Sequence, residues 1–271
     1  MEFSRIRLDI EASVATIRFN HEEVLNALSV EMLGGLGEAL DVVEAADSGV
    51  RCLILTGVGR AFCAGANLQT RREGAADAAG APAPKAAAAG ATLETVYHPV
   101  LRRLRALHCP IVTAVNGLAA GAGMSFALMG DMILAARSAY FLQAFRRIGL
   151  VPDCGSTWLL PRRIGTARAL ELSLLGEKLT SETALAWGLV NRVFDDAALG
   201  GEALTIARNL AEGPTIALGL IRDLYWRSTE NSFEDQLNLE CSSQRIAGRT
   251  ADFKEGVKAF LEKRPARFRG E

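Results

Sequence analysis

The sequence has little of what marks secreted, metal-binding or membrane-spanning proteins. Its five cysteines are widely spaced, odd in number and form no Cys-x-x-Cys pair, so we expect neither disulfides nor structural zinc. Its three histidines have no metal-site spacing, so no metal is expected. No uninterrupted apolar run approaches the roughly 20 residues that cross a bilayer. The first residues contain no apolar signal core, which indicates a cytoplasmic protein that is not bound to a membrane.

A surplus of one charge is also missing. The formal net charge is -1 over 271 residues, with 30 Lys and Arg against 31 Asp and Glu. Nucleic acid is therefore not expected as the main partner, because phosphate binding requires a strong basic surplus. Apolar residues are abundant at 49%, which is enough to build the core of one large globular domain, or of a domain with a smaller helical appendage.

The hydrophobic pattern of the first half of the chain alternates between strands and helices. Alternating apolar and polar residues over 6–10 and 14–20 predict an antiparallel hairpin. Ser29, followed by apolar residues at helical spacing, predicts a capped amphipathic helix. Short apolar runs typical of buried strands follow at 51–56, 111–115 and 131–135. Strands that alternate with helices predict crossover connections and a largely parallel sheet.

Two further regions differ from this pattern. Residues 74–91 are rich in alanine and interrupted by proline, so we expect a mobile surface insertion, either a lid or an ordinary variable loop. From Ala198 onward the pattern is helical, with expected helices at 198–212, 214–228, 232–247 and 250–262. The end of the chain is basic, and this charge indicates either a solvated helix face or a phosphate-binding role.

One carboxylate, Asp153, stands between Pro152 and Gly155, just before a helix-like segment. Two interpretations are open at this point. Aspartate is among the best helix N-cap residues, and Gly155-Ser156 suits a helix start. Alternatively, Asp153 is a single acid–base residue that faces a pocket.

Several familiar catalytic motifs can be excluded. Gly57-Val-Gly59 opens like a dinucleotide-binding fingerprint, but position 62 is Phe where the third glycine belongs. Residues 123–127 are one residue short of the nucleophile elbow of serine hydrolases. In those hydrolases the catalytic histidine follows the serine in the sequence, and every histidine here precedes Ser125.

Two turns rich in glycine and alanine remain, at residues 60–68 and 115–124, and each follows an expected buried strand. Small side chains after a strand allow a ligand to approach backbone N–H groups, and a helix N-terminus adds positive potential. Close helix–sheet packing would also require small side chains. Two such turns, each offering one N–H, resemble the halves of an oxyanion hole.

Three segments together resemble the enoyl-CoA hydratase/isomerase (crotonase) superfamily. They are Phe62-Cys-Ala-Gly-Ala-Asn-Leu68, Pro110-Ile-Val-Thr-Ala-Val-Asn-Gly117 and Leu150-Val-Pro-Asp-Cys-Gly155. The similarity covers nearly the whole chain. The context of the third segment and the closing residues 244–256 are most similar to the ring 1,2-epoxyphenylacetyl-CoA isomerases of phenylacetate breakdown.

The resemblance implies the roles of individual residues. The backbone N–H groups of Ala66 and Ala122 would bind the thioester oxygen of an acyl-CoA substrate. The CoA and acyl path would be lined by Asn26, Ala27, Leu28, Ala64, Gly65, Asn67, Leu68 and Gly121. Phe260 and Lys263 would complete the nucleotide pocket, either in the same chain or from a neighbouring subunit. No cofactor is implied, because CoA arrives as part of the substrate.

This sequence departs from the hydratases of the superfamily at two positions. Those enzymes use two glutamates to activate water, and the matching positions here are Ser125 and Phe145, which would contact substrate without titrating. Asn67 stands where many relatives carry aspartate. Asp153 matches the carboxylate of single-acid isomerases in the family, which can move a proton from one carbon to another.

The sequence therefore predicts an α/β crotonase-like fold. We expect a spiral core of ββα repeats over residues 1–197 and a helical C-terminal region over 198–271 that forms a homotrimer or homohexamer. The expected function is an acyl-CoA isomerase that shifts a double bond or rearranges a ring epoxide, with Asp153 as its acid–base. Enoyl-CoA hydration, and acyl-CoA binding without turnover, remain as alternatives.

Overall fold

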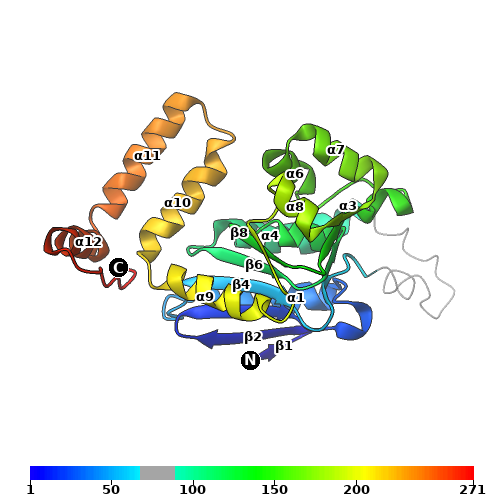
Figure 1. The fold of residues 1–271 in the computed structure, drawn as a ribbon, viewed down its shortest axis with the longest axis horizontal. Coiled ribbons are helices and arrows are strands. Elements are labelled where there is room, and N and C mark those ends of the chain that lie inside the picture. Colours follow the sequence, from blue (N-terminus) through cyan, green and yellow to red (C-terminus); the bar gives the residue numbers. More distant parts are fainter. Residues whose placement is uncertain (68–88) are drawn as a thin grey trace.

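The computed structural model describes residues 1–67 and 89–271, and these form two β-sheets surrounded by helices (Figure 1). The seven-stranded sheet has the order β1-β2-β3-β4-β6-β8-β11, and the four-stranded sheet has the order β10-β9-β7-β5. The strands are β1 Glu2–Phe3, β2 Ile6–Glu11, β3 Val14–Phe19, β4 Cys52–Gly57, β5 Ala61–Cys63, β6 Ile111–Val115, β7 Leu118–Ala120, β8 Met132–Ala136, β9 Tyr140–Leu142, β10 Lys178–Thr180 and β11 Arg192–Phe194.

The helices lie mostly between and after these strands. They are η1 Glu22–Val24, α1 Val30–Glu44, α3 Ala89–Thr92, η2 Leu93–Tyr97, α4 His98–Ala106, α5 Ala122–Ala127, η3 Ala144–Ile148, α6 Ser156–Ile164, α7 Thr166–Leu175, α8 Ser181–Trp187, α9 Leu199–Ala211, α10 Thr215–Ser228, α11 Phe233–Ala247 and α12 Ala251–Glu262. No helix in the described part of the chain is both long enough and apolar enough to span a membrane.

The expected hairpin, capped helix and parallel strands are all confirmed. β2 and β3 pair antiparallel, whereas β3, β4, β6 and β8 pair parallel in that order. The hydroxyl of Ser29 accepts a hydrogen bond from the Met32 N–H at 3.1 Å and so caps α1. Parallel pairing is possible because a helix returns the chain to the same edge of the sheet between successive strands.

Three parallel strands of the large sheet each continue into a short strand of the small one. β4 leads to β5, β6 leads to β7 and β8 leads to β9, and a helix follows each pair. This repetition confirms the predicted spiral of ββα units. Its consequence is that β5 and β7 lie side by side in the small sheet, so the two glycine-rich turns that follow them end at the same place.

Aromatic packing fixes these turns on the core. Phe19 of β3 meets the ring of Phe62 in β5 edge to face, with 5.4 Å between centroids. The ring of Phe19 also meets that of Phe126 in α5 edge to face, with 6.2 Å between centroids. All three rings are fully buried. Because both turns are adjacent to residues that pack on one side chain, their relative position is set by the core rather than by solvent-exposed contacts.

The four C-terminal helices are confirmed close to the expected bounds, but they differ in where they pack. α9 lies against the large sheet and contributes Leu199, Ala203 and Ala207 to the core. α11 and α12 extend away from the sheets (Figure 1). The expected insertion at 74–91 lies outside the described residues, except for 89–91. At 89–91 the expectation of a surface loop is wrong, because Ala89 begins the helical run α3–η2–α4.

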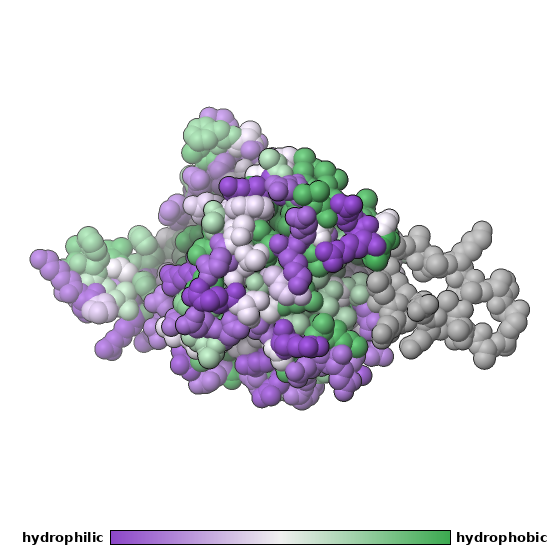
Figure 2. Space-filling model, turned by 45° about the vertical axis from the view of Figure 1, so that its right-hand side comes forward, coloured by the Kyte–Doolittle hydropathy of each residue, from purple (hydrophilic) through white to green (hydrophobic). Residues whose placement is uncertain are grey.

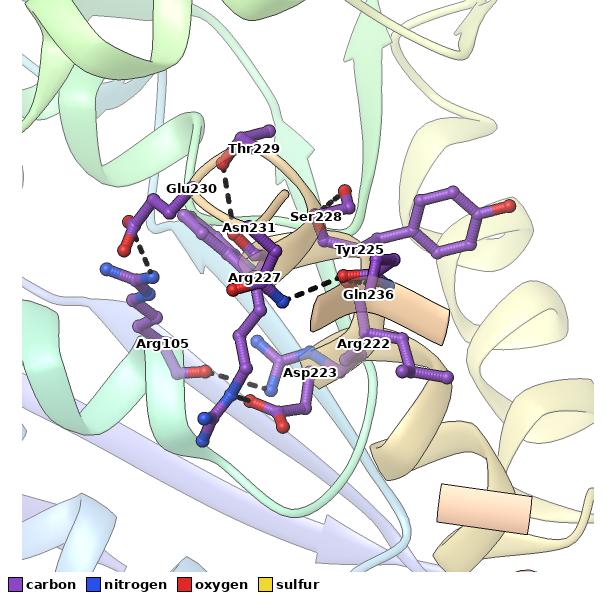
Figure 3. A network of polar contacts seen from close by, with 12 residues as sticks. Arg105, Arg222, Asp223, Tyr225, Arg227, Ser228, Thr229, Glu230, Asn231 and Gln236 are labelled. Carbon is purple, nitrogen blue, oxygen red and sulfur yellow. Dashed lines mark hydrogen bonds and ion pairs between the residues drawn. The ribbon is translucent and has the colours of Figure 1, made fainter. Parts of the chain in front are cut away.

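A buried arginine holds α10 against the core. Arg222, only 6% exposed, places its Nε 2.5 Å from the Asp131 carboxylate at the start of β8. Its other guanidinium nitrogens donate to the carbonyl oxygens of Leu104 and Leu107 at the end of α4. Figure 3 shows Arg222 in contact with the main chain of Arg105, whereas Arg227 of the same helix pairs with the exposed Asp223. One side chain therefore joins α10, α4 and the strand region of the large sheet.

Candidate active site

The first turn presents a backbone N–H at Ala66. The Leu28 N–H donates to the Gly65 oxygen at 2.7 Å, and the Asn67 N–H donates to the Leu28 oxygen at 2.8 Å. This is a parallel bridge between Leu28 and Ala66. In such a bridge the neighbours of Ala66 make the hydrogen bonds, so the N–H of Ala66 itself points to the other side. The turn is left-handed at Gly65, with φ +95°, which favours glycine.

The second turn presents the N–H of Ala122, the first residue of α5. The first N–H groups of a helix have no partner within the helix, and they carry the positive end of its dipole. Gly121, at φ +51°, turns the chain from β7 into the helix, and its own N–H donates to the Leu142 oxygen at 2.9 Å.

The two turns are in contact. A Cβ atom placed on Gly65 would lie 2.8 Å from the Ala120 oxygen and 3.6 Å from the Ala122 nitrogen. A Cβ on Gly123 would lie only 2.3 Å from the oxygen of Cys63. Only glycine permits this approach, which places the turn that carries Ala66 against the start of α5, where Ala122 lies. Two backbone N–H donors that point to one place can bind one oxygen that gains negative charge.

The loop that carries Asp153 is held in place by hydrogen bonds to its main chain. The Asp153 carbonyl oxygen accepts hydrogen bonds from the Ser125 hydroxyl at 3.1 Å, the Ser156 hydroxyl at 3.0 Å and the Ser156 N–H at 3.1 Å. Since Ser125 lies in α5, one turn after Ala122, this contact places the Asp153 loop beside the helix that carries the second donor.

The interpretation of Asp153 as the helix cap is wrong. α6 begins at Ser156, as the sequence indicated, but its N-cap residue is Gly155, and no side chain caps it. Left-handed backbone at Cys154 and Gly155, with φ +52° and +82°, separates the Asp153 side chain from the helix start. Such a conformation is strained for a cysteine, and strain of this kind is concentrated at functional sites.

Cys154 and Asp153 influence one another electrostatically. Burial, followed by the negative charge of Asp153 and a hydrogen bond to it, raises the pKa of the Cys154 thiol. Cys154 is 2% exposed, and the Oδ1 atom of Asp153 is also buried. The thiol therefore remains protonated near neutral pH, and it lies directly beside the carboxylate.

Ser125 and Phe145 both lie at this site and are buried. The Phe145 ring borders Gly121, with its Cζ 3.7 Å from where a Cβ on that glycine would stand. Neither side chain can exchange a proton as a carboxylate does. Asp153 is thus the carboxylate that these matched segments bring to the two turns.

The expected CoA-lining residues fall into three groups. Residues 26–28 and 64–67 lie side by side, but Asn26 is fully buried, and its side chain accepts from the His21 N–H and donates to the oxygens of Val58 and Ala61. Leu68 lies outside the described residues. Phe260 is 82% exposed on α12, Lys263 ends that helix, and Figure 1 shows α12 far from α6 within this chain.

Sequence reasoning missed Ser156 and the contact that Ser125 makes. Ser156 follows a glycine at a helix start, a position where a hydroxyl often bonds nearby backbone, so a signal was present. No local signal could have shown that Ser125 reaches a carbonyl 28 residues away. In the described part of the chain, no group of three or more His, Cys, Asp or Glu is arranged to hold a metal ion.

Comparison with known proteins shows the family of this chain. The family model for enoyl-CoA hydratase/isomerase matches residues 9–271. The 1,2-epoxyphenylacetyl-CoA isomerase of Escherichia coli K12 is 48% identical over the full length of both chains. A protein of Rhodobacter capsulatus named as a probable enoyl-CoA hydratase is 40% identical, also over both full lengths.

A solved structure confirms the fold. The crystal structure of an enoyl-CoA hydratase/isomerase from Cupriavidus metallidurans is 31% identical and superimposes with a TM-score of 0.89, covering 100% of this chain and 98% of the other. The crotonase-like architecture predicted from the sequence is therefore correct, and the chain belongs to the enoyl-CoA hydratase/isomerase family.

Proposed function

We propose that this protein is an acyl-CoA isomerase in which Asp153 acts as the single acid–base residue. The observation that carries the proposal is the combination of one carboxylate with two adjacent backbone donors. Asp153 is joined through Ser125 to the helix that begins with Ala122, and Ala122 borders the turn of Ala66. The 48% identity to a 1,2-epoxyphenylacetyl-CoA isomerase supports the same conclusion.

The proposed chemistry passes through an enolate. Asp153 removes a proton from a carbon of the acyl chain, and the electron pair moves onto the thioester oxygen. The N–H groups of Ala66 and Ala122 stabilise that oxygen, and removing one such donor typically costs about 10²–10³ in rate. Protonated Asp153 then returns the proton to a different carbon, which shifts the double bond. No redox or metal step is needed, and CoA enters only as part of the substrate.

Hydration of a 2-enoyl-CoA is the competing proposal, and the relative from Rhodobacter capsulatus favours it. Hydration requires a group that activates water, and two glutamates do so in the hydratases of this family. Here Ser125 is fully buried with its hydroxyl bonded to a carbonyl, and Phe145 is apolar. Neither residue can act as a general base for water.

An assay of the purified protein tests the proposal. With a 3-enoyl-CoA we expect the absorbance of the conjugated 2-enoyl thioester to appear. With crotonyl-CoA we expect that absorbance to persist. Hydration should be about 10²-fold slower than isomerisation or slower still, because no second acid–base group is available. A ring-epoxide thioester assayed in parallel identifies the acyl group. Faster hydration than isomerisation would reverse the assignment, and CoA-thioester binding without either reaction would indicate a binding protein.

We also propose that the protein forms a homotrimer or homohexamer through α10, α11 and α12. These helices enclose a groove of about 1050 Å³. Its lining includes Leu220, Leu224, Leu237, Phe253, Val257, Phe260 and Leu261. Phe260 and Leu261 are 82% and 75% exposed, and Figure 2 shows hydrophobic residues on the C-terminal helices that extend from the body. Exposed apolar groups gathered on one face are typical of a surface that another chain covers.

Replacing Leu261 with aspartate is expected to weaken this assembly at least about tenfold in dissociation constant, because a charge would enter an apolar contact. Sedimentation velocity over a concentration series measures the change. Lys254→Glu, on the same helix, alters charge without removing apolar surface and should leave the assembly intact. A wild-type protein that sediments as a monomer, or a Leu261→Asp variant that assembles normally, would contradict the proposal.

A further inference from the structure

Ser125 connects the two halves of the proposed active site. It is 0% exposed and lies in α5, the helix whose first residue is Ala122. Its hydroxyl oxygen is 3.1 Å from the Asp153 carbonyl oxygen and 3.4 Å from the Gly121 carbonyl oxygen. A hydroxyl has one proton to donate, and the shorter distance favours Asp153.

The other hydrogen bonds to the same carbonyl are local. Both come from Ser156, three residues along the chain, and they set the shape of the Asp153 loop. They do not fix where the loop lies relative to α5. The bond from Ser125 spans 28 residues of sequence and joins the loop to the helix directly. It therefore joins the main chain of Asp153 to the helix that begins at Ala122.

We propose that Ser125 is a positioning residue, and this inference rests on the proposed isomerase function. By donating a hydrogen bond to the Asp153 carbonyl, Ser125 keeps the carboxylate at a fixed distance and orientation from the Ala122 N–H. Proton removal and oxygen stabilisation then act on the same substrate. A displacement of about 1 Å in a reacting group can cost about 10²-fold in rate. The bond is made by the main chain of Asp153, so the carboxylate remains available for catalysis.

The residue type at 125 also fits this role. The carbonyl of Asp153 is an acceptor, so the facing side chain must donate a hydrogen bond. An ionised glutamate or aspartate at 125 could only accept, and it would place negative charge against the carbonyl oxygen and beside Asp153. An ionised acid at 125 could therefore not make the hydrogen bond to the Asp153 carbonyl that the serine makes, which links the single-acid chemistry to the identity of this residue.

Ser125→Ala tests the role, and Ser181→Ala is a matched control. Ser181 is also 0% exposed, and its hydroxyl donates to the Arg137 carbonyl at 2.7 Å, away from the site. Both variants lose one buried serine–carbonyl bond, so we expect similar shifts in the denaturation midpoint. For the thioester that the wild type isomerises, Ser125→Ala should lower kcat about 10–100-fold with KM changed less than about threefold. Ser181→Ala should retain wild-type kcat.

The remaining outcomes separate this inference from the proposed function. Ser125→Cys, which keeps a weaker donor, should recover part of the lost kcat. If Ser125→Ala isomerises at the wild-type rate, the positioning role is wrong and the isomerase assignment stands. If the wild type isomerises no thioester, a crystal structure of Ser125→Ala tests whether Ser125 positions Asp153. A longer distance between Asp153 and Ala122 than in the wild type supports the positioning role, and an unchanged distance overturns it.

Discussion

Asp153→Asn is expected to lower kcat for isomerisation by about 10²–10⁴-fold, the range that a positioned general acid–base supplies. Asparagine has nearly the same shape but cannot accept and return a proton. The substitution should leave the fold intact, because Ser125 and Ser156 bind the main-chain oxygen at position 153 and not the carboxylate. The change in KM should be small, since the backbone donors at Ala66 and Ala122 do not depend on the side chain.

The control for this prediction is Asp223→Asn, which neutralises an aspartate on α10 outside the site. It should retain wild-type kcat. Circular dichroism and the denaturation midpoint of both variants establish that they are folded. If Asp153→Asn is folded and isomerises at the wild-type rate, the proton is carried by another group. If both variants hydrate crotonyl-CoA equally well, a different water-activating residue must be present.

The elements that the sequence predicted correctly are those with a local signal. Ser29 at a helix start, the alternation over 6–10 and 14–20, and the apolar run at 51–56 each record a hydrogen-bonding or burial pattern within a few residues. The meeting of the two glycine-rich turns was also foreseeable, because small residues after parallel strands face the same edge of the sheet. The first three signals depend only on neighbours in sequence, and the last depends on the parallel order of the strands.

The contacts that were not predicted depend on tertiary packing. Cys154 adopts left-handed backbone although nothing in its side chain favours it, and the carbonyl just before it, that of Asp153, accepts a hydrogen bond from Ser125, 28 residues away. Asn26 was expected at the CoA path, yet its amide donates to the oxygens of Val58 and Ala61. In both cases a partner comes from a distant part of the chain, so the sequence around each residue carries no signal of it.

The buried contact of Arg222 is a further one that the sequence did not predict, because an arginine in an amphipathic helix has the same local pattern as a solvated charge. Its replacement by leucine is expected to reduce the free energy of unfolding by about 3 kcal/mol, near the lower end of the cost of breaking a buried pair. The reason is that Asp131 would lose its partner while its Oδ2 still accepts the Ile111 N–H at 2.7 Å. Two carbonyl oxygens at the end of α4 would also lose their donor. The lower end applies because the Asp131 side chain is 23% exposed and retains some solvation.

Urea denaturation of Arg222→Leu and Arg227→Leu measures this difference. Arg227 pairs with Asp223 one turn away on the exposed face of the same helix, and a pair of that kind contributes about 0.3–0.5 kcal/mol. Both arginines lie on α10 (Figure 3), one buried and one exposed. Because each substitution removes an arginine from the same helix, the difference between them measures the effect of burial. Equal destabilisation by the two substitutions would show that Arg222 does not anchor α10.

The pH dependence of the Arg222→Leu penalty identifies its electrostatic part. Burial raises the pKa of Asp131 above its ordinary value, and the charge of Arg222 opposes that rise. Without Arg222 the folded-state pKa should rise further, so the folded protein should take up a proton more readily than the unfolded chain. The variant's unfolding free energy should therefore recover relative to wild type as pH falls from about 7 toward about 4, the ordinary aspartate range. A penalty that is constant over this window would mean that lost packing and the carbonyl contacts, rather than the charge of Asp131, account for the destabilisation.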